Sequence, residues 1–214
     1  VEDFEAMFDA FWLYFGGSQF AWRPQRERIK DQGIIMQVAS GGPYTLDTPI
    51  MAGVEKALEA AQDYFWIQTP YLCPPPSTMI AMRDAVKRGV DVRLMVPKTQ
   101  DVPIMLWVNH AFYKRLLKMG VKLYERGDPF IHSKTYVTDD YVSCFGSANL
   151  DNRSFYLNYE NNVYIYDEGV ARQSRDIFLE DLEHSEQVSA EDLRWPLWEW
   201  FMQKVVILLG YSQW

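Results

Sequence analysis

The chain has 214 residues, 48% hydrophobic and 23% charged, which is enough for one well-buried domain and barely enough for two. Its formal net charge of −8 argues against a nucleic-acid binder, which usually carries a basic face, although it leaves room for a local basic pocket. The two cysteines, Cys73 and Cys144, predict no disulfide framework and favour a reducing compartment. No apolar run in the sequence is as long as a membrane span.

The first 17 residues predict a helix. Its apolar stripe consists of four phenylalanines at helical spacing, Phe4, Phe8, Phe11 and Phe15, and Gly16–Gly17 is a stop signal. The polar stretch 19–33 that follows is expected to be a linker. No capping residue precedes the helix, so we expect the chain to be part of something longer, with residues 1–33 ending a preceding unit.

Strand and helix signals then alternate along the chain. The expected strands are 33–40, 64–72, 90–97 and 121–127, and the expected helices are 47–64, 77–89 and 103–120. Thr48 is a plausible N-cap with Pro49 at the first helical position, while Gly89 and Gly120 are expected to end their helices. This alternation is typical of an α/β fold.

The pattern changes after residue 129. Residues 130–139 and 141–149 are two strand-like runs joined by Asp139-Asp140, which predicts a hairpin. A further strand is expected at 160–167 and a helix at 168–188, with Val170, Ile177 and Leu182 among its apolar positions. The sequence therefore predicts an α/β domain over 34–188, with a mixed β-sheet flanked by helices on both faces.

The hairpin carries a group of reactive side chains. If residues 130–139 form a strand, His132 and Lys134 share one face about 7 Å apart, and imidazole beside a fixed ammonium suits chemistry on an anion. Ser147 and Asn149 share a face of the next run by the same argument. A carboxylate is needed to orient the imidazole, and Glu160 at the start of the following strand is the best candidate.

Each of these residues also has a plain structural interpretation. A single histidine or lysine in a strand is most often structural or solvated, and Asp139 at a hairpin tip is more often a turn residue. Asn149 and Asn152 taken alone are turn formers as well. Only the joint pattern favours a site.

The joint pattern resembles the phospholipase D superfamily, whose signature is H-x-K-x4-D followed by G-S-x-N, present here as "HSKTYVTD" and "GSAN". The resemblance implies these roles: catalysis for His132 and Lys134, phosphate binding for Lys134, Ser147 and Asn149, orientation of the histidine for Glu160, and a structural place for Asp139. It also implies a reaction that uses no metal and no cofactor.

Longer stretches, over roughly residues 34–185, are similar to the second catalytic half of bacterial cardiolipin synthases. The resemblance implies transfer between two phosphatidylglycerols through a phospho-histidine, at the bacterial inner membrane, by a peripheral cytoplasmic domain that binds no nucleic acid. The first half's own H-x-K motif and the family's membrane helices are absent, and neither His110 nor His184 supplies that motif. The second histidine must then come from a missing half or from a second copy in a two-fold dimer.

Two alternatives for the function stay open at this point. One is a homodimeric phospholipase D-type phosphodiesterase or nuclease, and the other is an inert domain that binds only phosphate or a partner chain. The tail 189–214 is also open to two interpretations. Its apolar stripe, formed by Trp198, Phe201, Met202, Val205 and Leu208, suits either a membrane interface or packing on the domain.

Overall fold

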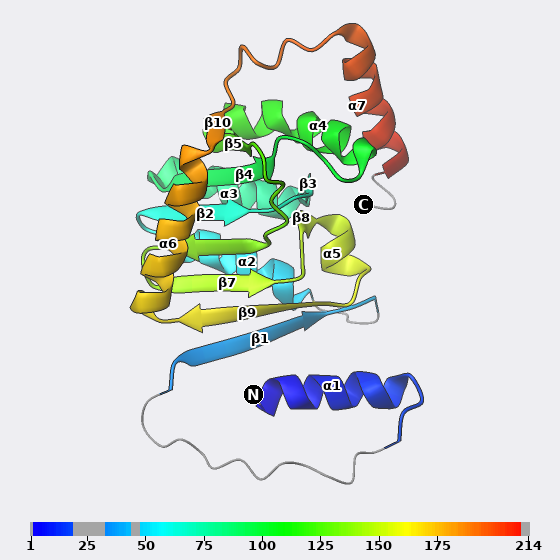
Figure 1. Ribbon diagram of the computed structural model, residues 1–214, viewed down its shortest axis with the longest axis vertical. Helices are drawn as coiled ribbons and strands as arrows, with labels where there is room; N and C mark the ends of the chain where they lie inside the picture. Colours follow the sequence, from blue (N-terminus) through cyan, green and yellow to red (C-terminus); the bar gives the residue numbers. More distant parts are fainter. Residues whose placement is uncertain (1, 19–32, 44–47, 211–214) are drawn as a thin grey trace.

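The described part of the chain in the computed structural model, residues 2–18, 33–43 and 48–210, is built around one sheet (Figure 1). Within these residues the sheet has eight strands. In spatial order they are β1 (Ile35–Gly41), β9 (Glu160–Tyr166), β7 (Val142–Gly146), β6 (Thr135–Thr138), β2 (Tyr64–Gln68), β4 (Asp91–Pro97), β5 (Lys122–Arg126) and β10 (Ser185–Gln187).

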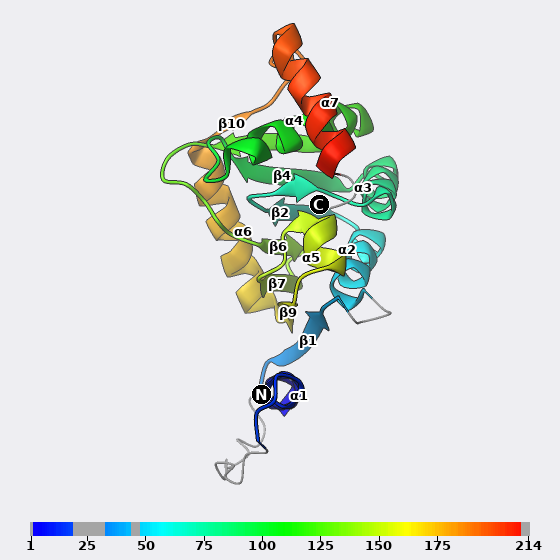
Figure 2. The same cartoon turned by 90° about the vertical axis from the view of Figure 1, so that its right-hand side faces the viewer.

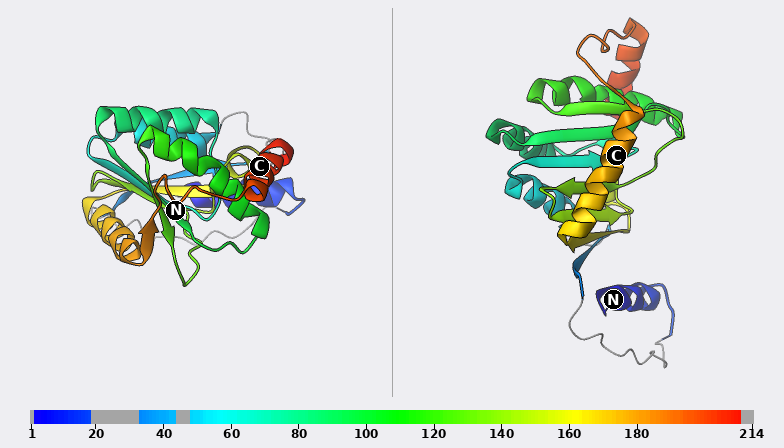
Figure 3. Two further views of the ribbon diagram at one scale, coloured as in Figure 1. Left: turned by 90° about the horizontal axis from the view of Figure 1, so that it is seen from above. Right: turned by 60° about the vertical axis from the view of Figure 1, so that its left-hand side comes forward.

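The sheet is mixed. Strands β2, β4 and β5 run parallel, and all other neighbours pair antiparallel. Helices α2 (Pro49–Ala60), α3 (Pro76–Arg88) and α4 (Pro103–Met119) cover one face, and α6 (Glu168–Glu183) crosses the other (Figures 2 and 3). This arrangement confirms the predicted α/β fold with helices on both faces of a mixed sheet.

The core has one cluster on each face of the sheet, and β2 contributes to both because its side chains alternate. Phe65 and Ile67 belong to the large cluster under α2, α3 and α4. Trp66 lies in the smaller cluster under α6, where its ring is 5.2 Å from that of Phe178. Burying side chains of this size stabilises the fold by about 1.5–3 kcal/mol each.

The predicted helix boundaries are largely confirmed by local chemistry. Gly89 and Gly120 end α3 and α4 with φ of 97° and 88°, a left-handed conformation that favours glycine. Pro49 is the first residue of α2, as predicted. Thr48 is at the N-cap position, but its side chain makes no capping hydrogen bond there.

Several predicted elements were wrong in extent, among them the helix expected at 47–64, which ends at Ala60. The expected strand 64–72 divides after Gln68, and Leu72–Cys73 forms β3, which pairs with β8 (Leu150–Asp151) in a separate two-stranded sheet. At this break the backbone bonds to the side chain of Asn109. This amide accepts from the Leu72 N–H at 2.9 Å and donates to the Pro70 carbonyl at 3.1 Å.

The helix predicted over 168–188 ends at Glu183. Residues Ser185–Gln187 form the edge strand β10 and pair with β5, because the last turn of α6 brings the chain back beside that strand. The Ser185 hydroxyl also donates to the Asp181 carbonyl at 2.7 Å, which satisfies one of the free carbonyls at the helix end.

The two ends of the described chain differ in packing. Helix α1 (Glu2–Tyr14) lies beside β1, and its phenylalanine stripe is largely exposed, with Phe8 at 52% and the adjoining Phe15 at 70%. Most of the predicted linker 19–33 is outside the described residues. Helix α7 (Leu197–Gly210) packs on α4 and buries Gln203 and Val206.

The contact between α7 and α4 supports the packing interpretation of the tail. Among the described helices, none combines the length and the apolar character that crossing a membrane requires.

Candidate active site

The predicted hairpin is confirmed. It consists of β6 and β7, and its turn residues Asp139 and Asp140 have φ of 54° and 51°. The Asp139 carboxylate accepts three backbone N–H bonds from residues 62–64, at 2.8, 3.0 and 2.9 Å. Asp139 therefore holds the connection between α2 and β2, at the end of the hairpin away from the histidine.

His132 and Lys134 are not on a strand, because β6 begins at Thr135. The alternation argument for their shared face was therefore wrong, yet the two side chains do meet. The Lys134 Nζ is 3.3 Å from both ring nitrogens of His132 and donates to the His132 carbonyl at 3.0 Å. The Lys134 carbonyl accepts from the Gly146 N–H at 3.1 Å, which ties this residue to the end of β7.

Ser147 and Asn149 also lie just beyond their strand, since β7 ends at Gly146. The Ser147 hydroxyl donates to a Glu160 carboxylate oxygen and accepts from the Asn161 N–H at 3.0 Å. The Asn149 side chain lines a small pocket together with Lys134. Its Oδ1 is buried and has no hydrogen-bond partner among the described residues.

Glu160 was expected to orient the histidine, but its hydrogen-bond partners are other residues. It is buried at the first position of β9, and its other carboxylate oxygen accepts from the Asn158 amide at 3.0 Å. The described residues contain no hydrogen bond between Glu160 and His132. The Glu160 charge instead acts on Lys134, where it favours the protonated amine. This carboxylate is thus bonded to Ser147, on the side of the site where the resemblance places phosphate binding.

The electrostatics of the site favour a neutral imidazole. Partial burial, followed by the neighbouring Lys134 charge, lowers the pKa of His132 below its ordinary value of 6.5. Burial also lowers the pKa of Lys134, and this outweighs the opposite effect of Glu160, Asp101 and Asp151. A neutral imidazole keeps the lone pair that nucleophilic attack or proton acceptance requires.

The sequence analysis missed three residues around the histidine. The ring of Phe130 stacks at 5.8 Å from His132, and the ring of Tyr71 meets it edge-on at 6.0 Å. Tyr71 donates to the two carboxylate oxygens of Asp101 at 2.9 and 3.0 Å. Phe130 lies within the motif stretch, whereas no local sequence pattern marks Asp101.

No group of three or more His, Cys, Asp or Glu side chains in the described ranges is placed to hold a metal ion. The site residues themselves offer an imidazole, an ammonium, a hydroxyl and an amide. That set suits the binding of a phosphate ester and attack on its phosphorus.

Fold and site together define a phospholipase D-type domain. A family profile described as "Cardiolipin synthase, PLD-like domain" matches residues 54–182. The chain belongs to this family.

The chain is similar in sequence to bacterial cardiolipin synthases. Cardiolipin synthase 2 of Staphylococcus epidermidis is 40% identical over 157 residues, which is 73% of this chain and 32% of that protein. Cardiolipin synthase of Clostridium perfringens is 33% identical over 198 residues, 89% of this chain and 42% of that protein. The chain thus spans between about a third and two fifths of the length of these relatives.

Solved structures support the fold. Nuc of Salmonella typhimurium, a phospholipase D family member, superposes with a TM-score of 0.57 at 22% identity, covering 73% of this chain and 100% of that one. Phosphatidylserine synthase of Haemophilus influenzae gives a TM-score of 0.68 at 16% identity, covering 83% of this chain and 45% of that one.

Proposed function

We propose that this chain is the second catalytic segment of a phosphatidyltransferase that joins two phosphatidylglycerols and releases glycerol. The observation that carries the proposal is the pairing of the His132 ring with the Lys134 ammonium at 3.3 Å, in a domain of the cardiolipin synthase family. Asn149, which lines a pocket with Lys134 and whose NH₂ group can donate, and the nearby Ser147 suit a phosphate diester.

The chemistry takes two displacements at phosphorus. A motif histidine attacks the phosphorus of one phosphatidylglycerol, the bond to the head-group glycerol oxygen breaks, and a second histidine gives that oxygen its proton. A hydroxyl of another phosphatidylglycerol then loses its proton to the second histidine and displaces the first. The product is cardiolipin, and both histidines return to their starting state. Lys134 is proposed to stabilise the negative oxygens during both steps.

This scheme needs a histidine that the site lacks. His110 is engaged with Glu199 at 2.9 Å and stacks on Trp195, and His184 caps the end of α6. We propose that the second motif comes from the first half of a longer protein or from a second copy of this chain. In either case two H-x-K motifs would face each other across one phosphate.

We further propose that the domain works at the surface of the bacterial inner membrane, on its cytoplasmic side. The face of α7 turned away from α4 is apolar: Leu197 is 84% exposed, Trp198 and Phe201 are each 60% exposed, and Leu208 is 81% exposed. Lys204 on the same helix lies over the exposed ring of Trp200, and both line a cavity with Lys114 and Arg115 of α4. Cations beside exposed aromatic rings suit an anionic phospholipid surface.

The test is the product formed from labelled phosphatidylglycerol in vesicles, with the chain assayed alone and together with the first half of a related cardiolipin synthase. Cardiolipin plus glycerol is the expected outcome when two motifs are present. Phosphatidic acid plus glycerol would replace the transferase with a phosphodiesterase that uses water. No product in any combination, with phosphate still bound, would indicate an inert binding domain.

A further inference from the structure

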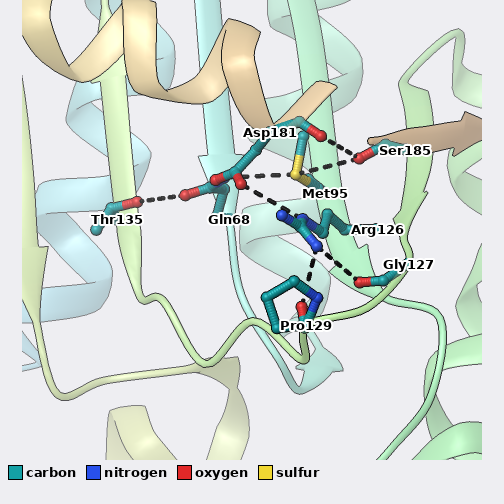
Figure 4. Close-up of polar contacts among 8 residues, drawn as sticks. All are labelled: Gln68, Met95, Arg126, Gly127, Pro129, Thr135, Asp181 and Ser185. Carbon is teal, nitrogen blue, oxygen red and sulfur yellow. Dashed lines mark hydrogen bonds and ion pairs between the residues drawn. The ribbon is translucent and has the colours of Figure 1, made fainter. Parts of the chain in front are cut away.

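The loop that carries His132 is attached at both ends to one buried polar cluster (Figure 4). The loop, residues 127–134, connects β5 to β6. The cluster consists of Gln68, Arg126 and Asp181 from three different elements, with Asp181 contributed by α6 on the far side of the sheet from α2.

The entrance of the loop is held through Arg126. This side chain is 8% exposed, and its Nε lies 3.4 Å from one carboxylate oxygen of Asp181. Its Nη1 donates to the Gly127 carbonyl at 3.0 Å and to the Pro129 carbonyl at 3.1 Å. One planar guanidinium thereby joins α6 to the backbone of the loop three residues before His132.

The exit of the loop is held through Gln68, which is 4% exposed. Its amide nitrogen donates to the other carboxylate oxygen of Asp181 at 2.7 Å, and its amide oxygen accepts from the Thr135 hydroxyl at 3.2 Å. Thr135 directly follows Lys134. The two oxygens of Asp181 are thus divided between the two ends of one loop.

We propose that Asp181, through Arg126 and Gln68, is a positioning residue that fixes the loop bearing His132 and Lys134. A segment without regular structure loses about 1–2 kcal/mol of backbone entropy per ordered residue, and that cost must be offset by contacts. The N–H groups of a guanidinium as buried as Arg126 need acceptors, so an oxygen at position 181 is needed to hold Arg126 against the loop carbonyls. That Asp181 positions the loop does not depend on the proposed function. Only the purpose of the positioning, to place His132 and Lys134 for catalysis, rests on it.

The two arms of the cluster differ in importance. Thr135 is also held by the sheet, where it pairs with Gln68 on one side and Phe145 on the other. Arg126 is held by the sheet in the same way, between Pro97 and Ser185, but its side chain reaches beyond the sheet to two carbonyls inside the loop. Loss of the Arg126 arm is therefore expected to loosen the loop more than loss of the Thr135 hydroxyl.

Two substitutions at Asp181 separate geometry from charge. Asp181→Ala removes both acceptors and leaves Arg126 buried without its carboxylate. Asp181→Asn keeps one oxygen that can accept from Arg126. Its NH₂ group can donate to the Gln68 amide oxygen if the Gln68 amide rotates by 180°. The Gln68 NH₂ group then faces Thr135 and can donate to its hydroxyl. Asp181→Asn should therefore preserve the loop, whereas Asp181→Ala should release it.

The experiment measures the loop directly in the full chain. Hydrogen–deuterium exchange of the Gly127 and Gly146 N–H groups, which are hydrogen-bonded at the two ends of the loop, should become at least about tenfold faster in Asp181→Ala and change little in Asp181→Asn. In parallel, the ring signals of His132, assigned by their loss in His132→Ala, should titrate closer to the ordinary value of 6.5 in Asp181→Ala. That shift is expected because a released loop exposes the His132 ring, and partial burial is the first cause of its lowered pKa.

Ser174→Ala is the matched control. It removes a hydrogen bond of 2.9 Å between α6 and the buried Ser143 of β7, so it weakens the same helix without touching the loop. If Asp181→Ala is destabilised but leaves loop exchange and His132 titration as in Ser174→Ala, the proposal is wrong. Should Asp181→Ala not fold, Arg126→Lys provides the same test, since the single nitrogen of lysine cannot occupy the positions of both Nε, which faces Asp181, and Nη1, which bonds the two carbonyls. Lack of activity on phosphatidylglycerol would overturn the proposed function and leave this result untouched.

Discussion

The two parts of the motif are supported in different ways. Ser147 and Glu160 lie where strands β7 and β9 end and begin, and the Ser147 N–H donates to the Asn161 carbonyl at 3.0 Å, next to the ladder. His132 lies on a loop, is exposed, and depends on side chains of other elements. The sheet itself thus builds the serine side of the site, whereas a buried polar cluster supports the histidine side.

This difference suggests different roles for the serine side and the histidine side of the site. On the serine side, the buried Glu160 and the Asn161 N–H fix the Ser147 hydroxyl in one place. The histidine must approach phosphorus and leave it again in the proposed scheme, which a loop with anchored ends permits. Four predictions test this comparison, from the largest expected effect to the smallest.

In an assembly that turns over phosphatidylglycerol, His132→Ala should lower the rate at least about 100-fold, because it removes a positioned group that handles a proton or attacks phosphorus. His184→Ala is the matched control, since this exposed histidine caps α6 and lies outside the site. Initial rates of glycerol release provide the measurement. Equal rates for the two variants would remove His132 from the mechanism.

Asp139→Ala should destabilise the fold by about 2 kcal/mol, roughly 30-fold in the folding equilibrium, because three backbone N–H groups lose their acceptor. Asp139→Asn should cost less, since asparagine keeps one oxygen and tolerates the φ of 54°. Urea denaturation measures both. If Asp139→Ala retained full stability and lost only activity, Asp139 would act in the site and would not be a structural residue of the hairpin.

Phe201→Glu should weaken binding to anionic vesicles about tenfold or more, because a charge replaces an aromatic ring on the outward face of α7. A point substitution is preferable to deleting the helix, since deletion would uncover α4. Ile177→Glu, at a position 56% exposed on α6, adds the same charge elsewhere and should leave binding unchanged. Vesicle co-sedimentation of both variants decides between a membrane face and a surface with no such role.

The smallest effect concerns titration. Lys134→Met should raise the pKa of His132, because it removes a neighbouring positive charge, and Asp101→Asn should lower it further, because Asp101 favours the protonated ring. Since the folded pKa lies below 6.5, His132 makes the fold less stable as the pH falls below that value. Lys134→Met should reduce this loss. NMR titration of the ring measures both shifts, and a fall in pKa on Lys134→Met would contradict the electrostatic account.

The sequence predicted which motif side chains come together better than it predicted their backbone. His132, Lys134, Ser147 and Asn149 were identified because they form a spaced motif. Their strand placement was wrong because strand length depends on a partner: β2 ends at Gln68 opposite Thr135, and the Thr69 N–H turns to the Met95 carbonyl. Since the ladder to β2 stops there, residues 130–134 form a loop, although they open a run that was expected to be a strand.

Contacts between elements that are distant in the sequence could not be predicted either. Asp181 and Arg126 are 55 positions apart, and no periodicity links a carboxylate on a helix to an arginine at a strand end. The edge strand β10 was missed for a similar reason, since three residues after a helix have no pattern of their own. The hairpin turn and the glycine helix ends were predictable because they depend only on local backbone chemistry.

The most direct test of the account is the specific activity of the chain, measured as glycerol released from phosphatidylglycerol, over a range of chain concentrations with the mass followed by light scattering. The account predicts negligible turnover by the monomer, and turnover per chain that rises only when two copies pair or a first half is added. A monomer with a constant rate of about 1 s⁻¹ or more would contradict it, because one H-x-K motif would then suffice.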